Sequence, residues 1–255
     1  MVTSTEIATR PGFTVRPFAT REEMAIAAAG DIAACLRELL STKRQVRMVF
    51  ASAPSQAEML AELSRQPGID WSRVTAFHMD EYIGLRLDHP AAFGGWLSRH
   101  FLERVPLGAR HLMEPGNDPE ASSQRYARLL AEAPIDIVCL GIGVNGHIAF
   151  NDPPVADFAD PLDVKVVTLD ETCRRQQVDE GCFARIDLVP RRAMTMTIPR
   201  LLAAGRLFAV VPGALKRDAA RRTLEGPIET ACPASILRTH ENCTLYLDKD
   251  SDPNG

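Results

Sequence analysis

The sequence predicts an α/β fold, a three-layer αβα sandwich built on a mostly parallel sheet. Short apolar runs rich in Val, Ile and Phe recur along the chain, and such runs are typical of buried parallel strands. Longer segments with apolar residues at helical spacing lie between them. Because strands that alternate with helices form a parallel sheet covered on both faces, we expect this layered architecture. A length of 255 residues fits one such domain, 1–255.

The alternation begins with an Ala-rich helix at 22–40, where Ile26, Ile32 and Leu36 recur at helical spacing. Apolar runs then predict strands at 46–50, 74–79, 135–140, 164–169, 194–198, 208–211 and 243–247. The segments between them predict helices at 55–66, 93–105, 119–133, 199–204 and 216–225. This order indicates a Rossmann-like sheet. The polar segments 1–12 and 249–255 are expected to be flexible tails.

Composition excludes several classes of protein. A net charge of −4 gives no basic field for nucleic acid or an acidic membrane surface. No apolar run approaches the ~20 residues of a transmembrane helix, and the first residues do not read as a secretory signal. The 6 cysteines are scattered without a C-x-x-C pair, so we expect neither a metal site nor a disulfide framework. Residence in the reducing cytoplasm follows.

The segment 135–154 carries the strongest functional signal. Its apolar strand runs into Gly141, Gly143 and Gly146, and His147 follows at once. Ligands of open α/β sheets bind beyond the carboxyl ends of the strands, so His147 is expected where chemistry takes place. Glycine permits the tight backbone that this position needs.

The same letters also satisfy G-x-G-x-x-G, the dinucleotide fingerprint. That motif requires a helix that opens at the third glycine and an acidic residue about twenty positions later. Pro153 and Pro154 block a regular helix there, and Asp170 lies beyond the expected spacing. We therefore do not expect a nicotinamide cofactor.

Three segments together resemble the glucosamine-6-phosphate deaminase/isomerase family, which shares its fold with 6-phosphogluconolactonases. They are Phe-His-Met-Asp-Glu-Tyr-Ile-Gly-Leu at 77–85, Gly-His-Ile-Ala-Phe-Asn-Asp-Pro at 146–153 and Cys-Pro-Ala-Ser-Ile-Leu at 232–237. The resemblance spans residues 15–250. It implies conversion of an amino-sugar phosphate, such as glucosamine 6-phosphate, into fructose 6-phosphate and ammonia, without a cofactor or a metal.

The resemblance also implies catalytic roles. Asp80 corresponds to the residue that carries a proton between C2 and C1 of the sugar, and His147 to the acid/base that opens the ring. The family flanks that histidine with two acids, where this chain has Asn145 and Asp152. Asn145 can hydrogen-bond the imidazole but cannot stabilise its cation as a charge does.

Substrate binding is expected at Ser52, Ser55, Glu81, Gly146 and Lys216 by the same resemblance. Lys216 matches the family's phosphate lysine, and both serines stand in the first phosphate loop. That loop lacks the family's two glycines, and Pro54 offers no backbone N–H. The family's phosphate arginine has no secure counterpart: ungapped alignment puts Asp179 there, with Arg174 and Arg175 nearby.

Other interpretations stay open at this stage. The adjacent acids Asp80 and Glu81 follow a strand, where acids often cap the next element. The chain is also compatible with a sugar-phosphate lactonase, in which His147 activates water, or with a non-catalytic sugar-phosphate sensor. The segment 155–158 does not match the residues that bind an amino-sugar activator in hexameric relatives, so no such activation is expected. A homo-oligomer is compatible with the sequence, which does not specify one.

Overall fold

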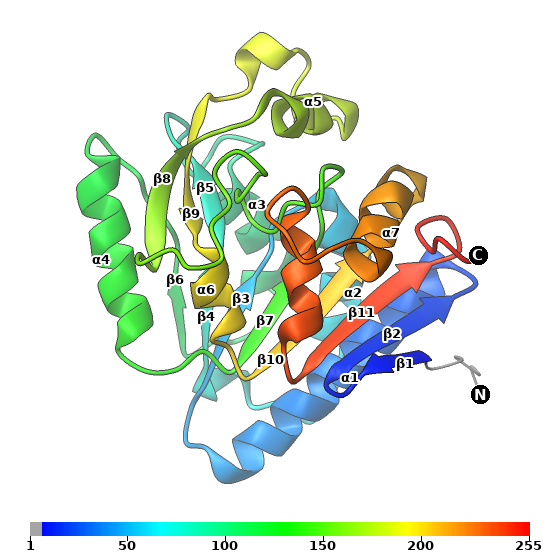
Figure 1. Cartoon of the computed structure of the whole chain (residues 1–255). Coiled ribbons are helices and arrows are strands. Elements are labelled where there is room, and N and C mark those ends of the chain that lie inside the picture. The colour runs from blue at the N-terminus through cyan, green and yellow to red at the C-terminus, as the bar shows by residue number, and fades with distance from the viewer. Residues whose placement is uncertain (1–6) are drawn as a thin grey trace.

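The computed structural model describes residues 7–255, with side chains from residue 11 onward. Its main sheet has eight strands in the order β1-β2-β11-β10-β7-β3-β4-β6, and every neighbouring pair is parallel except β1 with β2 (Figure 1). The strands are β1 (Ile7–Arg10), β2 (Phe13–Phe18), β3 (Val46–Phe50), β4 (Val74–His78), β6 (Ala109–His111), β7 (Ile137–Leu140), β10 (Arg206–Val211) and β11 (Cys243–Asp248).

Helices cover both faces of this sheet. The α-helices are α1 (Arg21–Thr42), α2 (Ala57–Ser64), α3 (Phe93–Leu97), α4 (Pro119–Ala131), α5 (Glu171–Asp179), α6 (Ile198–Leu202) and α7 (Arg217–Glu225). Short 3₁₀ helices lie at Pro54–Gln56, Trp71–Arg73, Ile186–Leu188, Ala214–Lys216 and Pro233–Thr239, and Ser98–Leu102 forms a π-helical turn. The expected three-layer αβα architecture is confirmed.

The two layers of core follow from the period of two along each strand. In β3, Met48 and Phe50 join the cluster that packs on α1 and α2, whereas Val49 faces the cluster under α4 and α7. A large apolar side chain contributes about 1.5–3 kcal/mol when it is fully buried, so these alternating residues hold the layers together. Thr20 fixes the start of α1, since its side chain accepts a hydrogen bond from the backbone N–H of Glu23.

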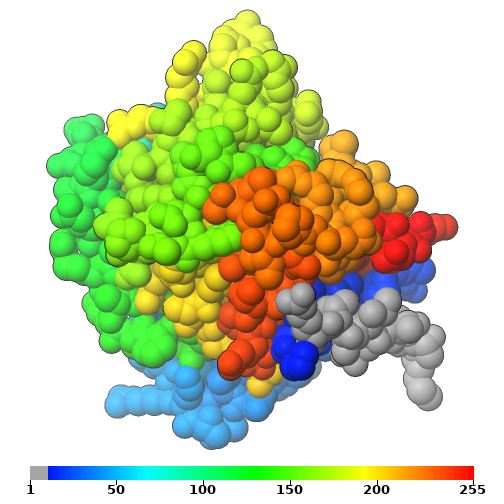
Figure 2. Space-filling view, viewed as in Figure 1, coloured from blue at the N-terminus to red at the C-terminus, as the bar shows by residue number. Residues whose placement is uncertain are grey.

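A second, smaller sheet stands beyond the carboxyl ends of the main strands. It has three strands in the order β5-β9-β8: β5 (Asp80–Tyr82), β9 (Arg192–Met196) and β8 (Val164–Thr168). An aromatic cluster of Tyr82, Phe93, Phe150 and Phe183 packs around it. Figure 2 shows the segment that contains α5, in yellow-green, above the body of the molecule. The small sheet and α5 therefore lie over the carboxyl ends of the main strands.

The chain ends differ from the expected flexible tails. Residues 7–10 of the 1–12 segment form the edge strand β1, and residues 1–6 lie outside the described part of the chain. The 249–255 segment folds back onto the protein, because Ser251 is fully buried and exchanges hydrogen bonds with Asp248. Arg217 also donates to the carbonyls of Lys249 and Asp250. These hydrogen bonds hold in place a polar segment whose composition predicts a flexible tail.

The order of the strands places one crevice at the centre of the sheet. The chain runs from β3 outward to β4 and β6, and then returns to place β7 on the other side of β3. In open parallel sheets a ligand binds at such a switch point, outside the carboxyl ends of the strands. The segments that follow β3, β4, β7 and β10 therefore meet above this position.

Candidate active site

A cleft of about 500 Å³, including its open mouth, lies at this switch point. Of the residues expected from the sequence, those that line the cleft are Ser52, Ser55, Asp80, His147 and Lys216. They come from the ends of four different strands, β3, β4, β7 and β10. Asn145, Asp152, Glu81 and Gly146 stand behind the lining.

The turn after β7 presents His147 to the cleft. The backbone N–H of Gly143 donates to the carbonyl of His147, and that of Gly146 donates to the carbonyl of Gly143. A Cβ on Gly143 would lie 2.2 Å from Cε1 and Nε2 of the imidazole, so the ring packs directly on this glycine. Gly146 has a φ of +87°, and a Cβ there would lie 2.7 Å from Sγ of Cys232. Gly146 therefore shapes the turn and does not face the cleft. No helix follows it, as expected when the dinucleotide motif was rejected.

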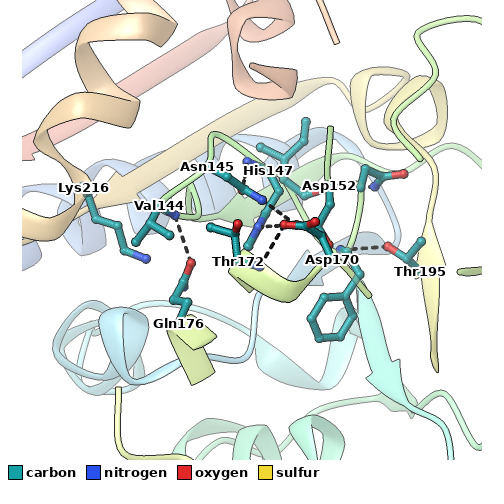
Figure 3. A network of polar contacts seen from close by, with 12 residues as sticks. Val144, Asn145, His147, Asp152, Asp170, Thr172, Gln176, Thr195 and Lys216 are labelled. Atoms are coloured by element: carbon teal, nitrogen blue, oxygen red, sulfur yellow. Dashed lines mark hydrogen bonds and ion pairs between the residues drawn. The ribbon is translucent and has the colours of Figure 1, made fainter. Parts of the chain in front are cut away.

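Asp152 holds the imidazole of His147 from behind. Nδ1 of His147 lies 2.8 Å from Oδ1 of Asp152 (Figure 3). Burial alone would raise the pKa of Asp152, but the charge and hydrogen bond of His147, with hydrogen bonds from Asn145 and the backbone of Asp170, lower it overall. The carboxylate therefore stays ionised and can orient the ring and stabilise its cation.

Asn145 acts differently from the expected contact with the imidazole. Its Nδ2 donates to Oδ1 of Asp152 at 3.0 Å, and its Oδ1 accepts the backbone N–H of His147 at 3.0 Å. The side chain therefore links the backbone of the turn to the carboxylate. The amide of Asn145 and Nδ1 of His147 thus meet at the same oxygen, Oδ1 of Asp152.

The small sheet anchors the loop that carries these groups. The backbone N–H of Phe150 donates to Oγ1 of Thr195 on β9 at 3.1 Å (Figure 3). The Asn151 side chain donates to the carbonyls of Ile148 and Met196. The loop is thus fixed between His147 and Asp152.

Asp80 opens β5 and faces the cleft from the opposite wall. The residue is 6% exposed, and it pairs across the small sheet with Thr195. Burial raises the pKa of Asp80 well above its usual value, and the nearby charges of Glu81 and Asp152 raise it further. A shielded carboxylate with a raised pKa is a stronger base than a free one, as proton abstraction from carbon requires.

Glu81 takes the structural role that the sequence left open for both acids. Its carboxylate accepts the backbone N–H groups of Tyr82, Phe93 and Gly94 at 2.8–3.0 Å, the last two at the start of α3. It also lies 3.6 Å from Nε2 of His78. The capping interpretation is therefore confirmed for Glu81, whose oxygens face backbone amides and not the cleft, whereas Asp80 remains free to act.

The loop after β3 supplies neutral polar groups. The buried Oγ of Ser52 has no hydrogen-bond partner in the protein, and it lines the cleft. Ser55 lies in the 3₁₀ turn that Pro54 begins. Ala53 is extended, with a φ of −149°, so the backbone does not form the left-handed turn of a glycine loop. The loop offers hydroxyls, but no nest of amides for an anion.

Lys216 reaches the same end of the cleft, where Glu180 meets it. Nζ of Lys216 lies 2.9 Å from Oε1 of Glu180, and the Gln176 side chain donates to that oxygen at 2.8 Å. Gln176 is in turn held by the backbone N–H of Val144 (Figure 3). Sequence reasoning missed Glu180 and Gln176, because the polar helix α5 carries no motif.

Neither expected arginine reaches this position. Arg174 donates to the carbonyls of Ile186 and Val189, and Arg175 pairs with Glu171 at the surface. Both side chains are held away from the cleft, and neither lines it. The sequence left the phosphate arginine unplaced among Arg174, Arg175 and others, and no arginine is among the residues that line the cleft.

One cluster near the cleft has a set of atoms that metals bind. His147, Asp152 and Cys173 offer ligand atoms within 4.8 Å of one another. Burial, followed by the charge of Asp152, raises the pKa of the Cys173 thiol well above its usual value. Since a metal binds the thiolate, these surroundings disfavour a metal. We assign none to the cluster.

Comparison with known proteins decides the family. The model of the family described as glucosamine-6-phosphate isomerases/6-phosphogluconolactonase matches residues 19–246. The chain belongs to this family. A glucosamine-6-phosphate deaminase of Exiguobacterium sibiricum is 35% identical over 188 residues, which cover 73% of each protein. One of Listeria innocua is 33% identical over 203 residues, 79% of this chain and 84% of the relative.

Solved structures of the glucosamine-6-phosphate isomerase/6-phosphogluconolactonase family share the fold. A monomeric glucosamine-6-phosphate deaminase superposes with a TM-score of 0.84 at 30% identity, and covers 93% of this chain and 98% of its own. A 6-phosphogluconolactonase of Thermotoga maritima gives a TM-score of 0.77 at 18% identity, covering 93% and 100% of the two chains, which shows the common fold alone. Among the described helices, none is long and apolar enough to cross a membrane.

Proposed function

We propose that this protein converts glucosamine 6-phosphate into fructose 6-phosphate and ammonia. One observation carries the proposal: a buried carboxylate with a raised pKa, Asp80, faces the same cleft as a histidine held by an ionised aspartate, His147 with Asp152. Two groups with different environments suit two different proton transfers. The relatives named glucosamine-6-phosphate deaminase support the choice of substrate.

His147 would open the sugar ring. The closed pyranose must lose the proton of its anomeric hydroxyl and gain one on the ring oxygen, and imidazole exchanges protons near neutral pH. Asp152 stabilises the imidazolium formed between these steps, because its carboxylate lies 2.8 Å from Nδ1. The ring nitrogen on the other side, Nε2, packs against Gly143 at the cleft.

Asp80 would then carry out the isomerisation. In the open chain, its carboxylate removes the proton from C2 and returns it to C1, while the aldehyde oxygen takes up a proton. The product has a hydroxymethyl group at C1 and an imine at C2. Water adds to the imine carbon, and the C2–N bond of the resulting carbinolamine then breaks. Ammonia leaves, and the C2 ketone of fructose 6-phosphate remains. Asp80 ends each cycle as a carboxylate, so no cofactor is consumed.

An ammonia assay tests the proposal. Purified protein is incubated with glucosamine 6-phosphate, and ammonia and fructose 6-phosphate are measured together. We expect the two products in equal amounts, and their loss in the Asp80→Asn variant. His147→Gln should slow the turnover of the closed pyranose far more than that of the small open-chain fraction. A pre-steady-state burst distinguishes the turnover of the two forms. Absence of ammonia with the folded wild-type protein would reject the deaminase proposal.

The lactonase alternative needs no base at C2. Asp80 lies buried in the cleft, where an ionised carboxylate costs stability, and a lactonase gives this residue nothing to do. A non-catalytic sensor likewise does not explain why His147 is paired with Asp152 at the cleft. We also propose that the enzyme works in the cytoplasm, because none of its cysteines forms a disulfide.

A further inference from the structure

The end of the cleft beyond His147 and Asp80 contains an ion pair where a phosphate would need free positive charge. Lys216 is 5% exposed, and its Nζ is 2.9 Å from Oε1 of Glu180. Both residues line the cleft. A lysine held by a carboxylate presents little net charge to an anion, and the carboxylate itself repels one.

The position of Glu180 is fixed by more than this pair. It is the C-terminal cap of α5, where its backbone N–H donates to the carbonyl of Gln176. Its Oε1 also accepts from the Gln176 side chain at 2.8 Å, and the other end of that amide accepts the backbone N–H of Val144 at 2.9 Å. The Glu180 carboxylate is thus tied through Gln176 to the same loop that carries His147, and Figure 3 shows the contact of Gln176 with Val144. A long, freely rotating side chain would move aside for a phosphate, but this one is held.

The remaining groups at this end of the cleft are neutral. Beside the ion pair, the polar lining residues that bear no charge are Ser52, Ser55, Gln56, Gln176 and Gln177. Among all the lining residues, Lys216 and His147 are the basic ones, and there is no arginine. Hydroxyls and amides both donate and accept hydrogen bonds, as sugar hydroxyls do, whereas a phosphate dianion only accepts.

We propose that Glu180 is a specificity-determining residue that weakens recognition of a phosphate dianion and lets an amino sugar with an uncharged far end compete for the cleft. This inference rests on the proposed deaminase function, because the orientation of the sugar follows from Asp80 and His147. The phosphate ester then remains a substrate, but its advantage over unphosphorylated glucosamine is small. Glu180, and not the chemistry at C1 and C2, sets that ratio.

Replacement of Glu180 by glutamine tests the inference. Glu180→Gln removes the charge and keeps an oxygen that can accept from Lys216 and Gln176. Glu171→Gln is the matched control, since it removes a charge from the same helix at an exposed site paired with Arg175. Glu180→Ala is a second variant in case the glutamine alters folding, which circular dichroism reports.

Two measurements separate this inference from the proposed function. The first is the binding of inorganic phosphate by calorimetry, which needs no catalysis. We expect Glu180→Gln to bind phosphate about tenfold more tightly than the wild type, and Glu171→Gln to bind as the wild type does. Equal affinities of the wild type and both Glu180 variants would overturn the inference, whether or not the enzyme releases ammonia.

The second measurement is ammonia release from glucosamine 6-phosphate and from glucosamine. In Glu180→Gln we expect the KM for the phosphate ester to fall about tenfold with kcat nearly unchanged, and the KM for glucosamine to stay the same. A parallel change for both sugars would show that Glu180 acts on the whole cleft, and would contradict a role in phosphate discrimination. If the wild type releases ammonia from neither sugar, the deaminase proposal fails, and phosphate binding still decides the role of Glu180.

Discussion

Gly143→Ala should disable the enzyme through the position of one ring. A Cβ at this site would lie 2.2 Å from Cε1 and Nε2 of His147, and 2.5 Å from Cδ2. The backbone itself tolerates alanine, because the φ of Gly143 is not among the positive values of the described glycines. The whole perturbation therefore falls on the imidazole.

The size of the effect follows from the required movement. Ordinary contact with a Cβ begins at about 3.4 Å, so the ring must move by about 1 Å or more. Asp152 holds Nδ1 at 2.8 Å, so a movement of this size changes the contact that orients the ring. A displacement of about 1 Å in a catalytic group costs about 10²-fold in rate. We expect kcat for the closed sugar to fall by about that factor.

The assay measures ammonia release with the thermal unfolding of each variant alongside. Gly30→Ala is the control, because it lies inside α1 with nothing within 4 Å of the added Cβ. Alanine at that helical position should stabilise the protein by about 0.5–1 kcal/mol and leave kcat unchanged. A folded Gly143→Ala enzyme with kcat within threefold of the wild type would refute the view that His147 needs this placement.

Three further predictions concern the other walls of the cleft. Asp80→Asn should lower kcat by about 10²–10⁴-fold. It should also raise the Tm of the same preparation, because it removes a buried acid; a lower Tm would contradict the view that the buried carboxylate destabilises the fold. Glu81→Gln removes one of the charges that raise the pKa of Asp80, so the acidic side of the pH profile of kcat/KM should move to lower pH. An unchanged profile would show that the titration of Asp80 does not control this side. Pro54→Gly adds an amide donor to the loop after β3 and should lower the KM for glucosamine 6-phosphate by about tenfold, with kcat as the internal control.

The central strands were predictable because their side chains are buried on both faces. β3, β4, β7 and β10 are mostly apolar, and glycine or polar residues lie within two positions after each of them. The ends of these strands carry Ser52, Asp80, His147 and Lys216, so the sequence also predicts that these residues meet. Parallel strands with shared carboxyl ends require it.

Helix α5 and strand β2 were not predictable in the same way, whereas two strands of the small sheet, β8 and β9, were expected at 164–169 and 194–198. Helix α5 buries Cys173, Gln176 and Gln177, and Val178 is its only other apolar residue besides Cys173, so it shows no apolar periodicity. In β2, Pro17 interrupts the alternation that marks a strand, although β2 pairs with β11 along its whole length.

The ion pair of Lys216 with Glu180 illustrates the same limit at the site. The two residues are 36 positions apart, and no local pattern links them. Only the packing of α5 over the cleft brings the carboxylate to the lysine. The contact of Asn145 with Asp152 is similar, because its geometry depends on how the loop after β7 closes.

Three energetically unfavourable features lie around this cleft: a strained backbone, a buried hydroxyl without a partner and a buried acid. Together they are the strongest reason to regard it as a functional site. Ala149 lines it with a φ of +49°, the one positive value among the described residues that are not glycine, and such a backbone costs about 1–3 kcal/mol. Ser52 keeps a buried hydroxyl without a partner there. Asp80 is a buried acid whose pKa is raised in the folded state, so its contribution to stability is present in acid, below its unfolded pKa, and is lost as the pH rises through the folded pKa. Above that folded pKa the ionised carboxylate opposes folding, and a purely structural role would favour asparagine. A protein that keeps these costs in one crevice keeps them for chemistry, which is why the Asp80→Asn variant should gain stability as it loses turnover.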